Sequence, residues 1–326
     1  MNPRLKTAPI SVGSGLLALD LLLLGREEVT ATRQYAGGSC GNVLAILAYL
    51  GWNSFPVARL GNDSRAQLVI DDLEDFHVNT SFVTKEKSGV TPVIVVRIAA
   101  DKAGRLKSKF EWKDPKTGAF LPRYRPLPQK IATLVTPKLP PAKVFYFDRA
   151  EKSTLLLAKA LRERGAVTFF EPTTYKDDAV FTACIAASDI VKYSVERIPT
   201  PPVNPIGDSP RLEIQTLGEK GLRYRLKIAT TTPGVWKHLP PVAVDNVKDA
   251  TGCGDWCSAG IIDQICSIGR DSFMSLPEKT IKNGIRFGQA LASINCKYEG
   301  ARGPMYHISK KKVIAEADSL LKSKVN

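Results

Sequence analysis

The sequence predicts an α/β protein built on one mostly parallel sheet, and two observations lead to this prediction. First, short apolar runs typical of strands alternate with longer segments in which apolar residues recur at helical spacing. Second, 326 residues with 44% hydrophobic content can bury a substantial core. Because parallel strands are joined by right-handed crossovers through a helix, this alternation favours helices packed on the faces of a single sheet.

The chain opens with extended segments that contain one acidic residue. A strand is expected over 10–15, and the Leu-rich run 16–24 continues extended with Asp20 at its middle. That carboxylate is either an exposed edge residue or a group directed at ligand hydroxyls, and both interpretations stay open at this point.

The first predicted helix covers 43–50 and is preceded by three glycines. Its apolar residues recur at helical spacing, while Gly37, Gly38 and Gly41 crowd its N-terminus. Backbone amides can therefore approach a ligand closely there, and Asn42 supplies both a donor and an acceptor.

The remaining elements keep the same alternation. Strands are expected at 56–60, 90–99, 144–147, 167–170, 190–193, 213–217, 221–228 and 242–247. Helices are expected at 64–76, 153–164, 179–187, 259–268, 281–294 and 310–322. The basic stretch 101–128 contains four prolines and no helical period. It is expected to leave the core, either as a flap over a site or as a surface insertion.

The stretch 249–255 reads Asp-Ala-Thr-Gly-Cys-Gly-Asp and lies where an expected strand gives way to an expected helix. The amides of Gly252, Cys253 and Gly254 are expected to point outward at the positive end of the helix dipole, forming an anion hole. Asp255 beside them can accept a hydroxyl proton. An anion hole beside a base suits phosphoryl transfer to an alcohol. The alternative is that Asp255 only complements the helix dipole.

The net charge of +14 is concentrated in 102–149 and 306–326. A local basic segment can steer anions such as nucleotides or phosphorylated substrates, although a solvated surface loop explains it equally well. A nucleic-acid partner is not expected, because the basic run lacks interleaved aromatic residues and the motifs of nucleic-acid-binding folds.

Six cysteines and three histidines show no metal-binding or disulfide spacing, so reduced thiols in a cytoplasmic protein fit best. A signal peptide is not expected, because Asp20 interrupts the apolar run 16–24. No run is long enough to span a membrane, and no membrane partner is expected.

Two signatures at opposite ends of the chain resemble the two motifs of the ribokinase-like (PfkB) carbohydrate kinase family. The first reads Gly-Gly…Gly-Asn…Ala…Leu-Gly over 37–51, and the second is 249–255. Between them, 216–221 resembles that family's Thr-x-Gly-x-x-Gly nucleotide loop. The resemblance covers nearly the whole chain, in order and at fitting spacing.

The resemblance implies a single domain over 1–326 with a three-layer ribokinase-like α/β core and a mostly parallel central sheet. It also implies a small β lid built from about 15–35 and 88–125. The homodimer that some members form through their lids is implied by family analogy alone.

The activity that the resemblance implies is ATP-dependent phosphorylation of a hydroxyl of a sugar or sugar-like alcohol. Asp255 corresponds to the general base, and the Gly252–Gly254 amides correspond to the anion hole. Cys253 replaces the usual Ala, but its role there is carried by its backbone amide. Substrate-binding positions of the family match Asp20, Gly37, Gly38 and Asn42. An alternative is a catalytically weak member that acts as a sugar- or nucleotide-binding regulatory protein.

The nucleotide-binding positions of the family match Ser194, Thr216, Gly218, Gly221 and Gln289. Mg²⁺ is expected to accompany ATP and to keep several of its waters. The family's Asn-x-x-Glu motif, linked to Mg²⁺, is altered to Ser-Val-Glu-Arg over 194–197, which makes Glu196 the candidate metal ligand in a shifted register. Some members also use a monovalent cation such as K⁺ near the segment that contains Asp249. Gln289 has the second interpretation of a helix-surface amide.

Overall fold

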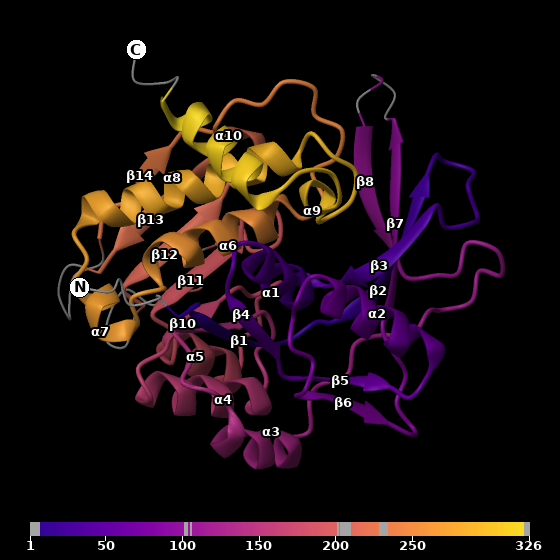
Figure 1. The fold of residues 1–326 in the computed structure, drawn as a ribbon, viewed down its shortest axis with the longest axis horizontal. Coiled ribbons are helices and arrows are strands. Elements are labelled where there is room, and N and C mark those ends of the chain that lie inside the picture. The colour runs from indigo at the N-terminus through magenta and orange to yellow at the C-terminus, as the bar shows by residue number, and fades with distance from the viewer. Residues whose placement is uncertain are drawn as a thin grey trace.

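The computed structural model describes residues 7–100, 104, 106–200, 202, 210–227 and 234–322, and these form a core of helices on both faces of a central sheet (Figure 1). The strands of that sheet are β1 (Ile10–Ser14), β4 (Asn53–Pro56), β9 (Val144–Phe147), β10 (Val167–Phe170), β11 (Ile190–Ser194), β12 (Leu212–Thr216), β13 (Leu222–Leu226) and β14 (Lys237–Leu239). Their order is β14-β13-β12-β11-β10-β9-β1-β4. Neighbours from β12 to β4 pair in parallel, whereas β13 and β14 are antiparallel at one edge. The predicted mostly parallel sheet is confirmed.

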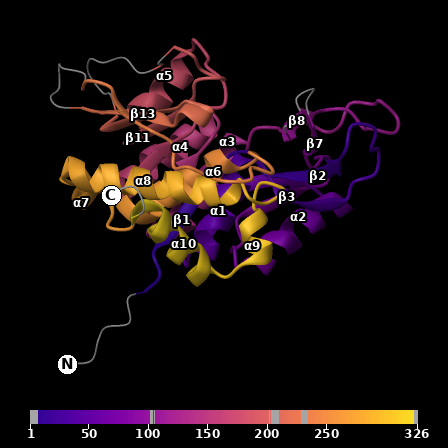
Figure 2. The same ribbon diagram turned by 90° about the horizontal axis from the view of Figure 1, so that it is seen from above.

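The strands alternate side chains between two separate hydrophobic clusters, which produces the layers. In β9, Val144 and Tyr146 belong to the cluster on one face, and Phe145 and Phe147 belong to the cluster on the other. The first face is covered by α1 (Ser39–Tyr49), α6 (Cys253–Ile265), α8 (Glu278–Asn295) and α10 (Lys310–Lys322). The second is covered by α3 (Gln129–Val135), α4 (Lys152–Glu163) and α5 (Ala179–Ala186), as Figure 2 shows. A strand buried on both faces explains the continuous apolar runs of the sequence.

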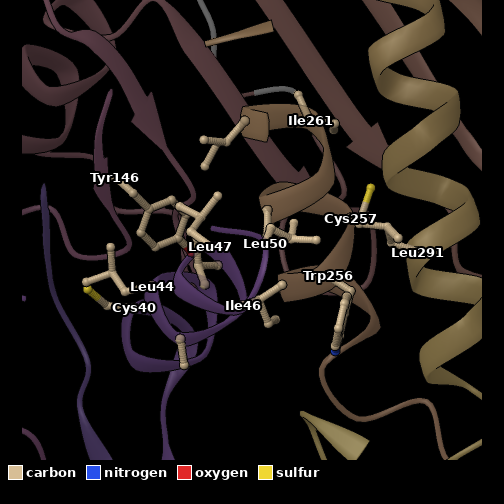
Figure 3. Packing of buried hydrophobic residues seen from close by; sticks show 14 of the residues in the cluster. Cys40, Leu44, Ile46, Leu47, Leu50, Tyr146, Trp256, Cys257, Ile261 and Leu291 are labelled. Carbon is tan, nitrogen blue, oxygen red and sulfur yellow. The ribbon is translucent and has the colours of Figure 1, made fainter. Parts of the chain in front are cut away.

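Helix α6 packs against both α1 and α8 on the first face (Figure 3). Glycines permit the closest approach: a Cβ at Gly260 of α6 would lie 2.7 Å from the Cα of Gly288 in α8. The Trp52 indole, just after α1, donates a hydrogen bond to Asp263 Oδ1 of α6 at 2.9 Å. The Trp52 hydrogen bond joins the end of α1 to α6, although the two helices are about 200 residues apart in the sequence.

A second sheet stands beside the core in the order β3-β2-β7-β8 (Figure 1). Its strands are β2 (Ala18–Leu24), β3 (Arg33–Gly37), β7 (Val93–Ala100) and β8 (Leu106–Glu111). Helix α2 (Ser64–Asp75) contacts β2 and β3, and β5 (Ala58–Gly61) pairs in parallel with β6 (Val83–Glu86). Residues 101–103 and 105 of the predicted lid range lie outside the described residues.

The stretch 101–128 was expected to leave the core, and its residues alone indicated no strand, but it contains β8. Most β8 side chains are exposed, and the strand lies at the edge of its sheet. With no buried face, it carries no apolar alternation, and its pairing with β7 determines its conformation.

The expected strand 242–247 is wrong, because this segment has no regular secondary structure. Pro240 and Pro241 cannot donate to a ladder, and Asn246 adopts a left-handed conformation with φ of 58°. Helix α6 is therefore preceded by a loop. The expected strand 221–228 ends at Leu226 as β13, and residue 228 lies outside the described residues.

Two short helices, α7 (Arg270–Met274) and α9 (Gly303–His307), complete the fold and were not predicted, as α3 was not. None of the helices in the described part of the chain is both long and apolar enough to cross a membrane.

Candidate active site

The first turn of α6 is set by a glycine in a left-handed conformation. Gly252, the residue before the helix, has φ of 75°, and a Cβ there would overlap the Ala301 carbonyl oxygen. Gly254 differs, because it is exposed and a Cβ there would come no closer than 3.8 Å to any side chain. Packing within the protein therefore requires glycine at 252 but would accommodate a Cβ at 254.

The predicted anion hole of three outward amides is partly corrected. The Cys253 amide donates to the Ala250 carbonyl at 3.3 Å, so it already has a long hydrogen bond within the loop. Among the described residues, no acceptor faces the amides of Gly252 and Gly254. These two amides, at the positive end of α6, are the ones available to an anion.

Asp255 and Asn42, two residues singled out in the sequence, form a direct contact between α6 and α1. Asn42 Nδ2 donates a hydrogen bond to Asp255 Oδ2 at 2.8 Å. Burial and, next, the nearby Glu171 carboxylate raise the pKa of Asp255 to about 7, although the Asn42 hydrogen bond and the Lys192 ammonium oppose this rise. A carboxylate with a pKa near 7 is suited to accept a proton at neutral pH.

A buried ion pair that the sequence analysis missed lies directly behind this turn. The Lys192 ammonium forms a salt bridge with Glu171 and donates to the Gly254 carbonyl at 3.1 Å. Tyr146 donates to the same carboxylate at 3.1 Å. A lysine inside the apolar strand β11 was the available signal, because a charge in such a strand must be paired.

Asp20 is buried, which excludes the interpretation as an exposed edge residue. Its side chain is 4% exposed and packs against Gly37, where a Cβ would overlap the carboxyl group. Gly38, with φ of 81°, precedes α1, and a Cβ there would overlap the Leu16 backbone. Within the described ranges, Asp20 Oδ1 and Asn42 Oδ1 are buried without a hydrogen-bond partner. Burial raises the pKa of Asp20 to about 7 as well. Unpaired buried oxygens are costly, so these two are candidates to meet ligand hydroxyls.

Asp148, like Glu171, is an acidic residue that the sequence analysis did not find. It follows β9 directly, is 1% exposed and accepts a hydrogen bond from the Leu16 amide at 2.9 Å. Arg149 forms an ion pair with it at 3.2 Å. An acid directly after a buried parallel strand was the signal, because ligands of open α/β sheets bind at the carboxyl ends of strands.

The predicted nucleotide residues lie at the ends of β11 and β12. Ser194 and Thr216 are directly opposite in the parallel register, and the Val195 amide donates to the Thr216 carbonyl at 2.9 Å. Gly218, with φ of 61°, lies near the exposed Glu196, whose Oε1 is 3.9 Å from the position of a Cβ at 218. Gly221, with φ of 88°, packs against the backbone at Leu239. The structure brings these residues together at the carboxyl ends of β11 and β12 and the turn into β13.

No family model matches the chain. Two curated proteins are similar to it in sequence. It is 24% identical over 304 residues to the probable fructokinase-6, chloroplastic, of Arabidopsis thaliana, covering 85% of this chain and 74% of the relative. It is 22% identical to the probable fructokinase-5 of the same organism, covering 97% and 98%. The chain is therefore similar in sequence to plant proteins named as probable fructokinases, in line with the resemblance to the ribokinase-like (PfkB) carbohydrate kinases.

Solved structures show the same ribokinase-like fold across nearly the entire chain. Arabidopsis thaliana ribokinase complexed with ribose and ATP matches with a TM-score of 0.66 at 18% identity, covering 95% of this chain and 99% of that one. Vibrio cholerae fructokinase with fructose, ADP and calcium ion bound matches with a TM-score of 0.68 at 17% identity, covering 96% and 100%. The predicted ribokinase-like fold is confirmed.

Gln289 of this ribokinase-like chain is not the surface amide of the second interpretation. It lies on α8, is 6% exposed, and donates to the Pro240 carbonyl at 3.2 Å. Arg286 donates to Gln289 Oε1 at 3.0 Å. The side chain therefore joins α8 to the segment after β14, and both of its polar groups are engaged.

Neither candidate cation position is a preformed cage of side chains in the described residues. In the described part of the chain, no three His, Cys, Asp or Glu side chains group together as metal ligands. Glu196 would supply a single exposed carboxylate, which fits Mg²⁺ held mainly by water and phosphate. Asp249 instead organises the loop before α6: its Oδ1 accepts from the Thr251 amide at 2.9 Å, and its Oδ2 accepts from the Gly300 amide at 2.8 Å.

Proposed function

We propose that this protein catalyses ATP-dependent transfer of the γ-phosphoryl group to a hydroxyl of a sugar or sugar-like alcohol. The contact between Asn42 and Asp255 carries this proposal. It places a carboxylate with a pKa of about 7 next to the free amide of Gly254 and to the unpaired Oδ1 of Asn42. A base, an anion site and a hydroxyl-binding group then lie within one small region.

In the proposed reaction, the acceptor hydroxyl gives its proton to Asp255 while its oxygen attacks the γ-phosphorus. The bond from that phosphorus to the β–γ bridging oxygen breaks, and ADP leaves with the electron pair. Asn42 orients the carboxylate through its amide hydrogen bond. The amides of Gly252 and Gly254 would stabilise the negative charge on the transferring group. Lys192, bonded to the Gly254 carbonyl, holds this turn in place.

Acceptor recognition is assigned to Asp20 and Asn42, with Gly37 and Gly38 keeping their surroundings compact. A carboxylate oxygen and an amide oxygen are acceptors for hydroxyl donors, and a pair of them suits vicinal hydroxyls. Relatives of this chain are named fructokinase, and structural neighbours include a ribokinase with ribose and a nucleoside kinase with inosine. We therefore expect the acceptor among fructose-like, ribose-like or nucleoside alcohols.

The ATP phosphates are assigned to the carboxyl ends of β11 and β12, where Ser194, Thr216, Gly218 and Gly221 lie. Gln289 is the candidate for the adenine side. Mg²⁺, when bound, would neutralise phosphate charge, and Glu196 is the residue placed to contact one of its waters or the ion itself. A monovalent cation is also proposed to bind near the loop that contains Asp249.

The sheet β3-β2-β7-β8 is proposed as a lid over the acceptor. It carries Asp20 on β2, and Ser108 on β8 donates a hydrogen bond to Asp249 in the loop before α6. Lid closure would exclude water from the transferring phosphate and so suppress ATP hydrolysis. A homodimer formed through the exposed edge of β8 remains part of the proposal.

The alternative of a catalytically weak regulatory member is not favoured. Such a protein would have no need of a base with a raised pKa in contact with Asn42, or of a Lys192 ion pair supporting the same turn.

The deciding experiment measures ADP release with Mg-ATP across a panel of fructose, ribose, sugar acids and inosine, for the parent and Asp255→Asn. We expect acceptor-dependent ADP release that falls at least ~10²-fold in the variant while ATP still binds. Asp245→Asn, an exposed carboxylate on the same loop, is the matched control and should keep full turnover. Equal turnover in the parent and Asp255→Asn would exclude this mechanism.

A further inference from the structure

Two cysteines meet at the start of α6, where the proposed anion site lies. The Sγ atoms of Cys253 and Cys296 are 2.8 Å apart, although the residues are 43 positions apart in the sequence. Cys253 is the first residue of α6, and Cys296 follows the last residue of α8. All six cysteines are free thiols, so this contact joins two reduced side chains.

The pair also differs from the other cysteines in its accessibility. Cys253 and Cys296 are partly exposed, whereas the remaining four are buried in the hydrophobic clusters. The buried four are Cys40, Cys184, Cys257 and Cys266. Gly254, which adjoins Cys253, is exposed, so the pair lies beside the solvent-exposed start of α6.

We propose that Cys253 and Cys296 form an oxidisable dithiol site that peroxide converts into a disulfide, and that this bond inactivates the anion site. The sulfur atoms need to approach by only about 0.8 Å to reach disulfide bonding distance. This site lies outside the proposed phosphoryl-transfer chemistry, which uses the amides of Gly252 and Gly254 and not the Cys253 side chain.

The surroundings assign a different role to each sulfur. The hydrogen bond from Cys253 holds the pKa of Cys296 below its usual range, although burial and Asp249 oppose this. The pKa of Cys253 is raised well above its usual range, first by that same hydrogen bond and next by burial. Cys296 is therefore the thiolate that reacts first, because thiolates and not thiols are the nucleophiles.

The chemistry needs one molecule of hydrogen peroxide per disulfide. The Cys296 thiolate attacks one peroxide oxygen, the O–O bond breaks, and hydroxide leaves, so that the sulfur becomes a sulfenic acid. The Cys253 sulfur then attacks the Cys296 sulfur and loses its proton, and the hydroxyl of the sulfenic acid leaves as water. Two thiols are oxidised and the peroxide is reduced to two waters in total. A dithiol reductant reverses the bond by thiol–disulfide exchange.

The disulfide would act on the anion site because Cys253 lies between its two free amides, those of Gly252 and Gly254. It would replace the contact that the Cys253 thiol makes with the Ala292 carbonyl at 3.4 Å. It would also tie the first turn of α6 to the end of α8. A displacement of about 1 Å at a reacting centre lowers turnover by up to ~10²-fold, so we expect at least ~10-fold lower turnover after oxidation.

The test treats the full chain with hydrogen peroxide in the presence of a metal chelator, removes the peroxide and maps peptides without reduction. We expect a Cys253–Cys296 cross-linked peptide, a loss of two titratable thiols, and complete reversal by dithiothreitol. Cys296→Ser and Cys253→Ala should each resist oxidation, relative to their own untreated activity. Cys184→Ser, a buried cysteine on α5, is the matched control and should respond like the parent.

The cross-link is measured without any assay of activity, so it does not rest on the proposed function, whereas the expected loss of turnover does. Absence of the cross-linked peptide in the parent, or peroxide sensitivity retained in Cys296→Ser and Cys253→Ala, would overturn the dithiol site. A cross-link that forms with unchanged turnover would overturn the inactivation. Failure to find any acceptor, with the cross-link still present, would instead count against the proposed kinase reaction.

Discussion

The proposed acceptor side and the proposed nucleotide side of this protein are built in opposite ways. On the acceptor side, Asp20 and Asn42 are both 4% exposed and keep a buried oxygen without a partner in the described part of the chain. On the nucleotide side, Glu196 and Gly218 are exposed at the ends of adjacent strands. Burying an unpaired polar atom is unfavourable, so the acceptor side resembles a site prepared for a small polar ligand.

The difference in burial indicates which substitutions each side of the site should tolerate. The acceptor side depends on side chains packed against glycine, so small changes in volume should abolish it. The nucleotide side depends on backbone turns open to solvent, so single side-chain changes should weaken it only modestly. The two sides should therefore respond differently to matched substitutions.

The largest effect is expected for Gly37→Ala. The new Cβ would overlap the Asp20 carboxyl group, so Asp20 must leave its place. We expect kcat/KM for the acceptor to fall by at least ~10²-fold, with ATP affinity little changed. Steady-state kinetics with each substrate varied in turn measures both quantities.

Gly41→Ala is its matched control, because a Cβ there meets only Leu17 Cγ at 3.7 Å. Alanine within helix α1 should leave turnover intact and add up to about 1 kcal/mol of stability. Equal activity of the two variants would show that Asp20 does not depend on the space at Gly37.

A smaller effect is expected for Asn42→Ala, which removes the hydrogen bond to Asp255. That bond lowers the pKa of Asp255, so its loss should move the pKa above about 7. We expect kcat/KM at pH 7 to fall by about 10-fold and to recover partly as the pH rises, because more of the base is then ionised. A pH–rate profile of parent and variant measures the shift. A profile that keeps its midpoint would assign Asn42 to acceptor contact alone.

The stability of the protein should depend on Asp255 in the opposite sense to an ordinary carboxylate. Its pKa is about 7 when folded against 3.8 as the ordinary value, so between these values the folded state holds a proton that the unfolded state has lost. The free energy of unfolding therefore falls as the pH rises from about 4 to 7. Asp20 acts in the same direction.

Asp255→Asn removes that contribution from one of the two groups. We compare the free energy of unfolding of the variant with that of the parent at each pH. This difference should favour the variant by at least about 1 kcal/mol more at pH 8 than at pH 4, which corresponds to a pKa shift of less than one unit. Urea unfolding at both pH values measures it. A difference that is the same at pH 4 and pH 8 would show that the Asp255 pKa is ordinary.

The smallest effect is expected for Glu196→Gln on the nucleotide side. Because Glu196 is exposed and would contact a largely hydrated Mg²⁺, we expect KM for Mg-ATP to rise by about 3-fold, with kcat/KM for the acceptor unchanged at saturating ATP. The matched control is Glu219→Gln, an exposed carboxylate in the turn 218–220. A loss of 10²-fold in Glu196→Gln would remove the contrast between the two sides.

The sequence analysis located the parts of the site that depend on local backbone chemistry. The glycine-rich starts of α1 and α6 were predicted because glycine in a left-handed or crowded turn leaves a local signal. The prediction of a strand at 242–247 was wrong, because alternating apolar residues do not indicate whether a neighbouring strand is available for pairing. Strand β8 was missed for the converse reason, since its pairing with β7 leaves most of its side chains in solvent.

The α/β class and the mostly parallel sheet could be predicted from periodicity, and Asp255 and Asn42 from glycine spacing, because both are properties of neighbouring residues. Asp20 was a candidate as an acid in a Leu-rich run and through the family resemblance. Only the tertiary structure decided that Asn42 donates to Asp255, that Lys192 and Glu171 support the turn, and that Cys253 touches Cys296. Each of these contacts joins segments that are distant in the chain. Their geometry follows from how α1, α6 and α8 pack on one face of the sheet, which no local pattern records.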